Sequence, residues 1–405
     1  MRVLVLNSGS SSVKGALFEA VVAPGSHPAV TLTGLFTGSV TGIGTSPTVR
    51  YREAGVERTD PAAGLKTHDE AVRRLVLLAR DKGIEAVGHR IVHGGHWFTQ
   101  AVRIDEPVLS RFNQLAELAP LHNPAGLSGI QQARAILGER MPMVAVFDTA
   151  FHHRLPDYAQ AYALPSTITE RFHIRRYGFH GLAHGSSARL YAETAGKPIG
   201  NVNLVTLHLG NGCSATAIRG GQSVDTSMGF TPLEGLIMGT RCGDIDPALV
   251  GFLAGAMDRS CRDIEQMLNE RSGLLGLSGL SSDMATLLQA EREGHEGARL
   301  AVESFCYRAR KYLGAYLAAL GGAEAVVFSG GIGEHAPDIR RRISSGMEWC
   351  GLVLDQAANQ AITKAPSGTI MRISGSGAIL AAFVAGIDEE SAIARETISC
   401  LTRSI

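Results

Sequence analysis

Two arginines of this chain stand among glycines, where neither a regular helix nor a regular strand is expected. Arg90 lies in GHRIVHGG (residues 88–95), and Arg241 lies in GTRCGDID (residues 239–246). Glycines let a ligand approach the backbone closely, and a guanidinium group presents a planar fork of N–H donors to an oxyanion. Both arginines are therefore candidates for binding a carboxylate or a phosphate. A structural ion pair explains either one of them equally well.

An acidic residue and a histidine add to this set. Asp148 follows the apolar run 143–147, which predicts a buried strand, and ligands of α/β sheets usually bind at the carboxyl ends of strands. A helix N-cap explains Asp148 as well. His180, in RRYGFHG (residues 175–181), lies between glycines and aromatic residues, as a ligand-facing histidine would. For His152 and His153 we favour structural roles.

His89, His93 and His96 have the spacing of metal ligands on one face of a helix. Gly94 and Gly95 interrupt any helix in this segment, and no acidic residue lies inside it. A zinc hydrolase is therefore a minor hypothesis. Metal analysis after chelation would separate it from an enzyme with an exchangeable ion.

Glycine-rich turns follow several strand-like runs. The runs 3–6 and 13–18 flank NSGSSS, the runs 204–209 and 214–218 flank GNG, and the run 325–329 precedes a third turn, GGIGE. Exposed N–H groups in such turns can bind phosphate, although a plain hairpin explains any one of them. The chain contains neither a P-loop nor a dinucleotide-binding G-x-G-x-x-G motif. The first two segments predict two halves of similar design.

Helical patterns alternate with these strands. Apolar residues recur every three or four positions over 300–320, and Gly321 and Gly322 follow as a natural stop. Residues 70–80, 186–195 and a segment from about 337 also predict helices. Alternating helices and strands indicate an α/β fold with a mixed or parallel sheet, and the end of the run 143–147 suggests a domain boundary near 147–150.

Composition limits the function further. The 405 residues include 38 Lys or Arg and 38 Asp or Glu, so the net charge is zero and a nucleic-acid or anionic-membrane partner is not expected. The longest nearly apolar run, residues 377–387, is shorter than the roughly 20 residues of a membrane helix. The N-terminus lacks a signal-peptide pattern, and the six cysteines contain no C-x-x-C. We expect a cytoplasmic, multi-domain protein.

Nine segments in the family's order make the chain resemble the acetate kinases. They are LNSGSSSVK (6–14), GHRIVHGG (88–95), LAPLHNPA (118–125), FDTAFH (147–152), RRYGFHG (175–181), HLGNG (208–212), DTSMGFTPLEGLIMGTR (225–241), GDIDP (243–247) and GGIGE (330–334). The resemblance spans the whole chain, and the long segments are highly specific.

The resemblance implies two ribonuclease-H-like (actin-like ATPase) α/β domains with an interdomain cleft. Two domains that bind substrates between them should close to exclude water. Residues 1–149 plus about 387–405 would form an N-terminal domain on the Mg²⁺ and acetate side. Residues 150–386 would form a nucleotide-binding and dimerisation domain. The implied reaction is ATP + acetate ⇌ ADP + acetyl phosphate in a homodimer, with Mg²⁺ or alternatively Mn²⁺.

The resemblance also implies roles for individual residues. Catalytic roles fall on Arg90, Asp148, His180 and Arg241. Arg90 would also bind the substrate, with an apolar pocket for the acetate methyl made by Val92, Leu121, Phe179 and Pro232. Nucleotide contacts fall on Lys14, His208, Leu209, Gly210, Asn211, Gly212, Asp283, Met284, Ala285, Gly331, Ile332, Gly333, Glu334 and His335. Asn7 and Glu389 would position the metal.

The reaction limits what Asp148 can do. A carboxylate acceptor carries no proton at neutral pH, because carboxyl groups ionise near pH 4. We therefore expect Asp148 to orient Arg90, the substrate or the metal rather than to act as a strong base.

Some positions depart from the family pattern. Ala285 stands where an arginine is common, which leaves nucleotide choice open. GFHGLAH replaces GFHGTSH at 178–184, and the altered segment 385–391 leaves Glu390 as an alternative to Glu389.

Propionate kinase is the nearest alternative function, because one methylene changes discrimination by only about 1–3 kcal/mol. Val92, bulkier than alanine, favours acetate. A non-catalytic ATP-binding relative is a further alternative, and the retention of all four catalytic positions argues against it.

Overall fold

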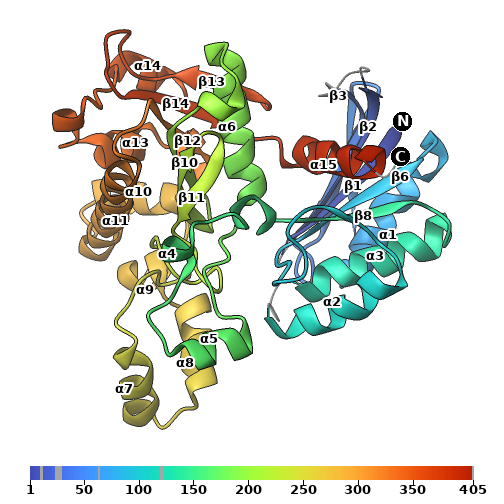
Figure 1. The fold of residues 1–405 in the computed structure, drawn as a ribbon, viewed down its shortest axis with the longest axis horizontal. Helices are drawn as coiled ribbons and strands as arrows, with labels where there is room; N and C mark the ends of the chain where they lie inside the picture. The colour runs from blue at the N-terminus through green and yellow to red at the C-terminus, as the bar shows by residue number, and fades with distance from the viewer. Residues whose placement is uncertain (10–11, 23–29, 63, 119–122, 404–405) are drawn as a thin grey trace. The chain divides into compact units, whose positions relative to one another are not determined.

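The computed structural model of the chain describes residues 1–9, 12–22, 30–62, 64–118 and 123–403. The chain forms two compact units, whose elements are labelled in Figure 1. Unit 1 comprises Met1–Ala150 and Asp388–Ile405, and unit 2 comprises Phe151–Ile387. Each unit contains its own sheet, and the residues of interest lie at strand ends in both.

Among the described residues, the sheet of unit 1 has eight strands in the order β5-β4-β3-β2-β1-β6-β8-β7. The strands are β1 (Arg2–Ser8), β2 (Ser12–Val22), β3 (Val30–Thr41), β4 (Thr48–Glu53), β5 (Val56–Pro61), β6 (Ala86–Ile91), β7 (Val102–Arg103) and β8 (Met143–Phe147). Each of the strands β1 to β4 pairs antiparallel with the next one along the chain, and β6 pairs parallel with β1 on one side and with β8 on the other.

Helices cover both faces of this sheet, which explains why the central strands are apolar without alternation. The helices of unit 1 are α1 (His68–Ala79), α2 (Glu106–Leu118), α3 (Asn123–Leu137) and α15 (Glu389–Arg403). Figure 1 shows α15 on one face and α1 and α3 on the other. A Cβ at Gly88 would clash with Thr397 of α15, so glycine permits the close approach of α15 to β6.

The described part of unit 2 contains a six-stranded sheet in the order β11-β10-β9-β12-β14-β13. Its strands are β9 (Leu204–Leu209), β10 (Cys213–Arg219), β11 (Gln222–Thr226), β12 (Ala325–Ser329), β13 (Thr369–Arg372) and β14 (Ala381–Gly386). The helices are α4 (Asp157–Gln160), α5 (Ser166–Phe172), α6 (Gly181–Ala195), α7 (Ala248–Met257), α8 (Cys261–Glu270), α9 (Gly273–Ser278), α10 (Met284–Arg292), α11 (Glu296–Leu320), α12 (Gly330–His335), α13 (Pro337–Ser344) and α14 (Gln356–Ala361).

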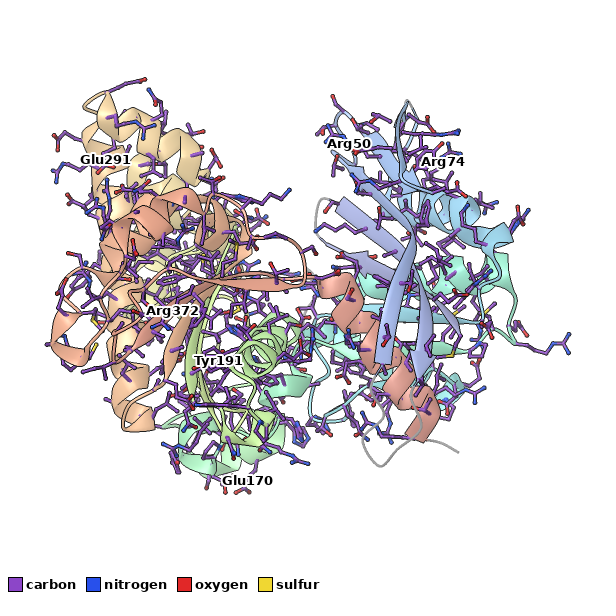
Figure 2. All side chains as sticks on the ribbon, turned by 90° about the horizontal axis from the view of Figure 1, so that it is seen from above. Arg50, Arg74, Glu170, Tyr191, Glu291 and Arg372 are labelled. Atoms are coloured by element: carbon purple, nitrogen blue, oxygen red, sulfur yellow. The ribbon has the colours of Figure 1, made fainter. Side chains whose placement is uncertain are left out.

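Helix α6 packs on one face of the unit 2 sheet and α11 on the other (Figure 1). The ring of Tyr191 on α6, labelled in Figure 2, lies 5.4 Å from the ring of Phe383 on β14. Helix α11 ends at Gly321, whose φ of 69° is left-handed. The predicted helix and its glycine stop are confirmed.

The two sheets share one design. In unit 1 the order β3-β2-β1-β6-β8 places an antiparallel meander beside two parallel strands. In unit 2 the order β11-β10-β9-β12-β14 repeats this arrangement. The prediction of two similar halves is confirmed, and the α/β class with mixed sheets is observed.

The expected third turn is corrected by the structure. Residues 330–334 are the start of helix α12, which follows β12 directly. Gly330 has a φ of 76°, and a Cβ there would lie 2.7 Å from the carbonyl oxygen of Leu209. This one glycine makes the sharp bend, so the helix begins without a loop.

Within the described ranges, no helix is both long enough and apolar enough to cross a bilayer.

Candidate active site

Arg90 and Asp148 form a two-bond ion pair in unit 1. Arg90 lies near the end of β6, and Asp148 follows β8 directly, so neighbouring parallel strands bring them together. Arg90 Nε donates to Asp148 Oδ1 at 2.9 Å, and Arg90 Nη2 donates to Asp148 Oδ2 at 2.6 Å. Asp148 is 1 % exposed. The carboxylate therefore fixes the plane of the guanidinium group.

Asn7 extends this pair to the C-terminal helix. Arg90 Nη1 donates to Asn7 Oδ1 at 3.0 Å, and Asn7 Nδ2 donates to Glu389 Oε2 at 3.0 Å and to Glu390 Oε1 at 3.2 Å. These bonds orient the amide without ambiguity, because its oxygen faces a cation and its nitrogen faces two anions. Glu390, which the sequence left as an alternative to Glu389, thus lies in the same hydrogen-bonded group as Glu389.

The start of α15 positions both glutamates. Asp388 Oδ1 accepts a hydrogen bond from the backbone N–H of Ser391 at 2.8 Å, as an N-cap does. Glu389 and Glu390 then occupy the first turn of the helix, where the helix dipole stabilises negative charge.

Burial and charge act in opposite directions on this cluster. Burial alone would lower the pKa of Arg90, but the charges of Asp148 and Glu389 outweigh it and raise that pKa. Burial raises the pKa of Glu390, Lys14 lowers it, and Glu389 raises it further. We call the hydrogen-bonded group of Asn7, Arg90, Asp148, Glu389 and Glu390 the unit 1 cluster. In this cluster Arg90 stays charged, whereas the negative charge of Glu390 is unfavourable without a further cation.

The donor set of the unit 1 cluster fits a hard divalent cation. Glu389 and Glu390 supply carboxylate oxygens, which Mg²⁺ prefers. Among the residues that the structure describes, no group of three or more His, Cys, Asp or Glu side chains is arranged as a metal cage. Magnesium usually binds through one or two carboxylates plus substrate phosphates, so two glutamates suffice.

The three histidines of the zinc hypothesis differ in their surroundings. His89 lies on β6 and is buried, His93 is buried beyond the strand, and His96 is exposed. Burial lowers the pKa of His89 to about 3. No helix covers this segment, as the glycines predicted.

In unit 2, His180 lies at the N-cap of α6 with a φ of 57°. Left-handed backbone is rare for residues with a Cβ, and such strain is concentrated at functional sites. His180 Nδ1 lies 2.9 Å from Ser214 Oγ on β10. The ring of His180 is thus held by β10 and lies 4.8 Å, centroid to centroid, from the ring of His208 on β9.

Arg241 lies beside Gly212, in the turn that connects β9 to β10. A Cβ built on Gly212 would lie 3.4 Å from His180 Nε2 and 3.5 Å from Arg241 Nη1. Arg241 Nη1 donates to the carbonyl oxygen of Pro232 at 3.1 Å, and burial lowers the pKa of Arg241. Within the described part of the chain, no carboxylate pairs with this guanidinium group. A half-buried cation without an anionic partner is suited to bind an anionic ligand.

The strand ends of unit 2 surround the expected nucleotide contacts. His208 and Leu209 end β9, and Gly210–Gly212 connect it to β10. His208 Nδ1 lies 3.1 Å from Ser329 Oγ, at the residue that precedes α12. The turn 210–212 and the start of α12, residues 331–333, therefore lie at one edge of the sheet, where parallel β9 and β12 both end.

Other expected nucleotide residues have local structural contacts. Asp283 caps α10 by accepting a hydrogen bond from Thr286 N at 2.8 Å. Met284 is 3 % exposed, so its side chain belongs to the core, whereas Ala285 is exposed. Glu334 accepts hydrogen bonds from backbone N–H groups of Gly330 and Ile387. His335 Nδ1 lies 2.5 Å from the carbonyl oxygen of Thr363, and Lys14 pairs with Asn7 across β2 and β1.

The expected apolar pocket is only partly described. Val92 belongs to unit 1 and is 9 % exposed. Phe179 and Pro232 belong to unit 2, where Phe179 is fully buried and accepts a hydrogen bond from His152 Nε2 at its carbonyl oxygen. This contact gives His152 the structural role that we favoured. Leu121 lies outside the described residues.

Comparison with known proteins identifies the family. The model of the acetokinase family matches residues 2–395. The chain belongs to the acetokinase family. It is 44 % identical over its whole length, and over the whole of the relative, to the acetate kinase of Chloroherpeton thalassium.

Acetokinase structures share the fold. The crystal structure of Porphyromonas gingivalis acetate kinase matches with a TM-score of 0.86 at 37 % identity, and covers 99 % of both chains. A propionate kinase from Francisella tularensis matches with a TM-score of 0.87 at 36 % identity, over 98 % of this chain and 99 % of its own. The predicted two-domain, actin-like ATPase class is confirmed. As an acetokinase, the chain is an ATP-dependent kinase that needs a divalent metal.

Proposed function

We propose that this protein transfers the γ-phosphoryl group of ATP to acetate, giving acetyl phosphate and ADP, and catalyses the reverse reaction. The observation that carries this proposal is Arg90, held by Asp148 and Asn7 beside Glu389 and Glu390. In this arrangement the oriented, permanently charged guanidinium group of Arg90, which can bind an anion, lies next to the carboxylates of Glu389 and Glu390, which can bind a metal.

Unit 1 supplies the site for the acceptor and the metal. The hydrogen bonds to Asp148 and Asn7 engage three of the five N–H groups of Arg90. One N–H on each Nη atom is left to donate to an acetate carboxylate or to the migrating phosphoryl group. Mg²⁺, with Mn²⁺ as an alternative, would be held by Glu389 and Glu390 with Asn7 orienting them. When bound, it neutralises phosphate charge.

Unit 2 supplies the site for the nucleotide. The turn 210–212 and the first turn of α12 lie at one edge of the sheet, where Asn211 and Gly331 are exposed, and backbone N–H groups of such turns suit phosphate oxygens. Asn211 and Ala285 are exposed and available to contact the rest of the nucleotide. Met284 is buried, and Glu334 accepts hydrogen bonds from the backbone N–H groups of Gly330 and Ile387, so we expect neither side chain to contact the nucleotide directly.

The reaction needs no general base. An acetate oxygen forms the new bond to the γ-phosphorus, the bond to the bridging oxygen breaks, and that electron pair leaves with ADP. Acetate is ionised at neutral pH, so Asp148 has no proton to accept and serves to orient Arg90. Arg90, Arg241 and His180 donate to the charge of the transferring group, which is the main need of phosphoryl transfer.

The identity of the acceptor is decided by turnover. ADP formation is measured from ATP and Mg²⁺ with acetate, propionate and butyrate as separate acceptors. We expect acetate to give the highest kcat/KM, because Val92 narrows the methyl site. A preference for propionate would support the alternative function with the same mechanism, and a solved propionate kinase shares this fold. Nucleotide binding without turnover would favour a non-catalytic relative.

We further propose that two copies associate through unit 2. Helix α7 has the sequence ALVGFLAGAM, and Leu249, Phe252 and Met257 on it are 42 %, 68 % and 48 % exposed. An exposed helix of this composition is typical of a protein interface. Light scattering is expected to give a dimer, and Phe252→Asp is expected to weaken it. The substrates and the zero net charge also support a cytoplasmic enzyme without nucleic-acid or membrane partners.

A further inference from the structure

Three buried side chains of unit 2 form a chain of hydrogen bonds that ends on the ring of His180. Thr206 Oγ1 lies 2.7 Å from His184 Nδ1, and Ser214 Oγ lies 2.7 Å from His184 Nε2 and 2.9 Å from His180 Nδ1. Thr206, His184 and Ser214 are completely buried. We call these three residues the relay. None of them is among the site residues expected from the sequence.

The hydroxyl of Thr206 sets the direction of the relay. It has one proton and two acceptors within reach, namely His184 Nδ1 at 2.7 Å and the carbonyl oxygen of Thr216 at 3.4 Å. The contact with Thr216 is longer than the about 2.5–3.0 Å of an ordinary O–H···O hydrogen bond. Donation to His184 Nδ1 gives this buried proton a close acceptor, and a buried donor without one is costly. Thr206 therefore donates to His184 Nδ1, and the proton of a neutral His184 lies on Nε2.

His184 is neutral in this environment. Its two ring nitrogens face hydroxyl groups rather than carboxylates, and burial lowers its pKa well below 6.5. His184 Nε2–H donates to Ser214 Oγ, so the proton of that hydroxyl is directed at His180 Nδ1. A neutral imidazole that accepts at Nδ1 carries its own proton on Nε2.

The Nε2 edge of His180 lies beside Arg241. Both His180 Nε2 and Arg241 Nη1 lie within 3.5 Å of a Cβ position built on Gly212. An N–H on Nε2 and an N–H of the guanidinium group can therefore donate to the same anion.

We propose that the relay fixes the tautomer of His180, so that Nε2 carries a proton towards the transferring phosphoryl group whether or not the ring is charged. Thr206, His184 and Ser214 are positioning residues in this role. The identity of the anion rests on the proposed function, whereas the tautomer is a property of the chain alone.

This role predicts a dependence on pH in relay variants. A protonated imidazole has N–H groups on both nitrogens, so Nε2 donates without help. A neutral imidazole has only one N–H group. Without the relay, a neutral His180 would be a mixture of the Nδ1–H and Nε2–H tautomers. Among the described residues, the titratable or charged groups near the ring include His208 on β9, Arg241, and His184 on α6, which shares Ser214 with it. The loss in a relay variant should grow as pH rises above about 6.5, the ordinary pKa of imidazole.

The kinetic test uses Ser214→Ala and Thr206→Val in the full-length enzyme. At about pH 8.5 we expect kcat to fall about 10-fold, less than the roughly 10²–10³-fold loss that removal of an oxyanion donor causes. At about pH 5.5, where imidazole is protonated, the loss should nearly vanish, with KM for ATP and acetate unchanged throughout. Thr206→Ser, which keeps the hydroxyl, should restore the wild-type profile.

Thr216→Val is the matched control. Thr216 is equally buried and faces Thr226, with 2.9 Å between their hydroxyl oxygens, so its side chain is outside the relay. Its pH profile should match that of the wild type. A loss in Ser214→Ala and Thr206→Val that is the same at all pH values would overturn the proposal, because a merely structural defect has no reason to follow imidazole ionisation.

A second measurement observes the tautomer directly. In protein labelled with ¹⁵N-histidine, the His180 ring should show a protonated Nε2 and an unprotonated Nδ1 at high pH, and Ser214→Ala should give a mixture. A protonated Nδ1 in the wild type would overturn the relay even if acetate turnover is normal. Absence of turnover with any carboxylate would overturn the proposed function, and the spectrum would still decide the relay.

Discussion

Asn7 and Glu389 are joined by a hydrogen bond of 3.0 Å, although 382 residues separate them along the chain. Asn7 is the penultimate residue of β1, and Glu389 begins α15, the helix that belongs to the same unit. The proposed acceptor and metal site is therefore assembled from segments near both ends of the sequence, and α15 contributes to it as well as to the core.

Glu390→Gln should separate metal binding from folding. Burial raises the pKa of Glu390 above 4.5 in the folded state, so its contribution to the stability of the metal-free protein is fully present below pH 4.5 and is lost as pH rises through the raised pKa. A divalent cation binds the ionised form, so the increase in Tm caused by Mg²⁺ should grow over the same pH range. We expect Glu390→Gln to weaken Mg²⁺ binding about 10–100-fold.

Glu396→Gln is the control for this experiment, because Glu396 lies on the same helix and burial also raises its pKa. It should leave the Mg²⁺ dependence of Tm and of activity intact. An unchanged Mg²⁺ response in Glu390→Gln would contradict the assignment. Chelation should abolish turnover reversibly in the wild-type protein.

Asp148→Asn should lower kcat about 10²-fold, because loss of the charged two-bond acceptor lets the Arg90 guanidinium rotate. KM for ATP should change little, since the proposed nucleotide contacts other than Lys14 lie on unit 2. The control is Asp60→Asn, which removes an exposed ion pair with Arg74; Arg74 is labelled in Figure 2. The measurement is steady-state kinetics of both variants, which gives kcat and KM for ATP. A rise in KM with normal kcat would exclude an orienting role.

Arg241→Ala should lower kcat about 10³-fold or more, the range typical of an arginine that stabilises phosphoryl transfer. Its guanidinium group has no carboxylate partner in the described structure, so its removal leaves no buried anion behind. KM for ATP should rise much less than kcat falls. Arg219→Ala, at the exposed end of β10, should have no effect. Normal kcat in Arg241→Ala would refute its role.

Val92→Ala should shift the choice of acceptor. Enlarging the methyl site by two carbons should raise kcat/KM for propionate relative to acetate about 10-fold, within the range of one methylene. The measurement is a competition between the two carboxylates. Val102→Ala, a half-buried valine on β7, serves as the control. An unaltered ratio would show that Val92 does not border the methyl group.

Gly212→Ala should slow turnover about 10–100-fold without unfolding the protein. The added methyl group would lie 3.4 Å from the His180 ring and 3.5 Å from Arg241, in ordinary contact with both, so it would occupy the space beside these groups that the proposed anion needs. Thermal melting should remain near that of the wild type. Gly314→Ala on α11, where a Cβ meets no neighbour within 4 Å, should retain full activity. Full activity of Gly212→Ala would contradict a shared anion site there.

The sequence by itself determined the family, the α/β class and the repeated strand–turn–strand units. Its long motifs identify the acetokinase family, and apolar runs such as 3–6 and 204–209 predict buried strands because fully covered strands need no polar alternation. Gly321 marks the end of α11 because the left-handed backbone there favours glycine. These features depend on local physics, which a sequence displays directly.

Only the tertiary structure decided how the polar residues are paired. Arg90 and Arg241 look alike in sequence, yet one is held by Asp148 and the other has no described carboxylate partner. Glu390 joins the site only because α15 folds back onto β1, and the relay depends on Thr206 and Ser214 meeting His184 from two strands. Such pairings follow from strand order and helix placement over long separations, and no local pattern encodes them.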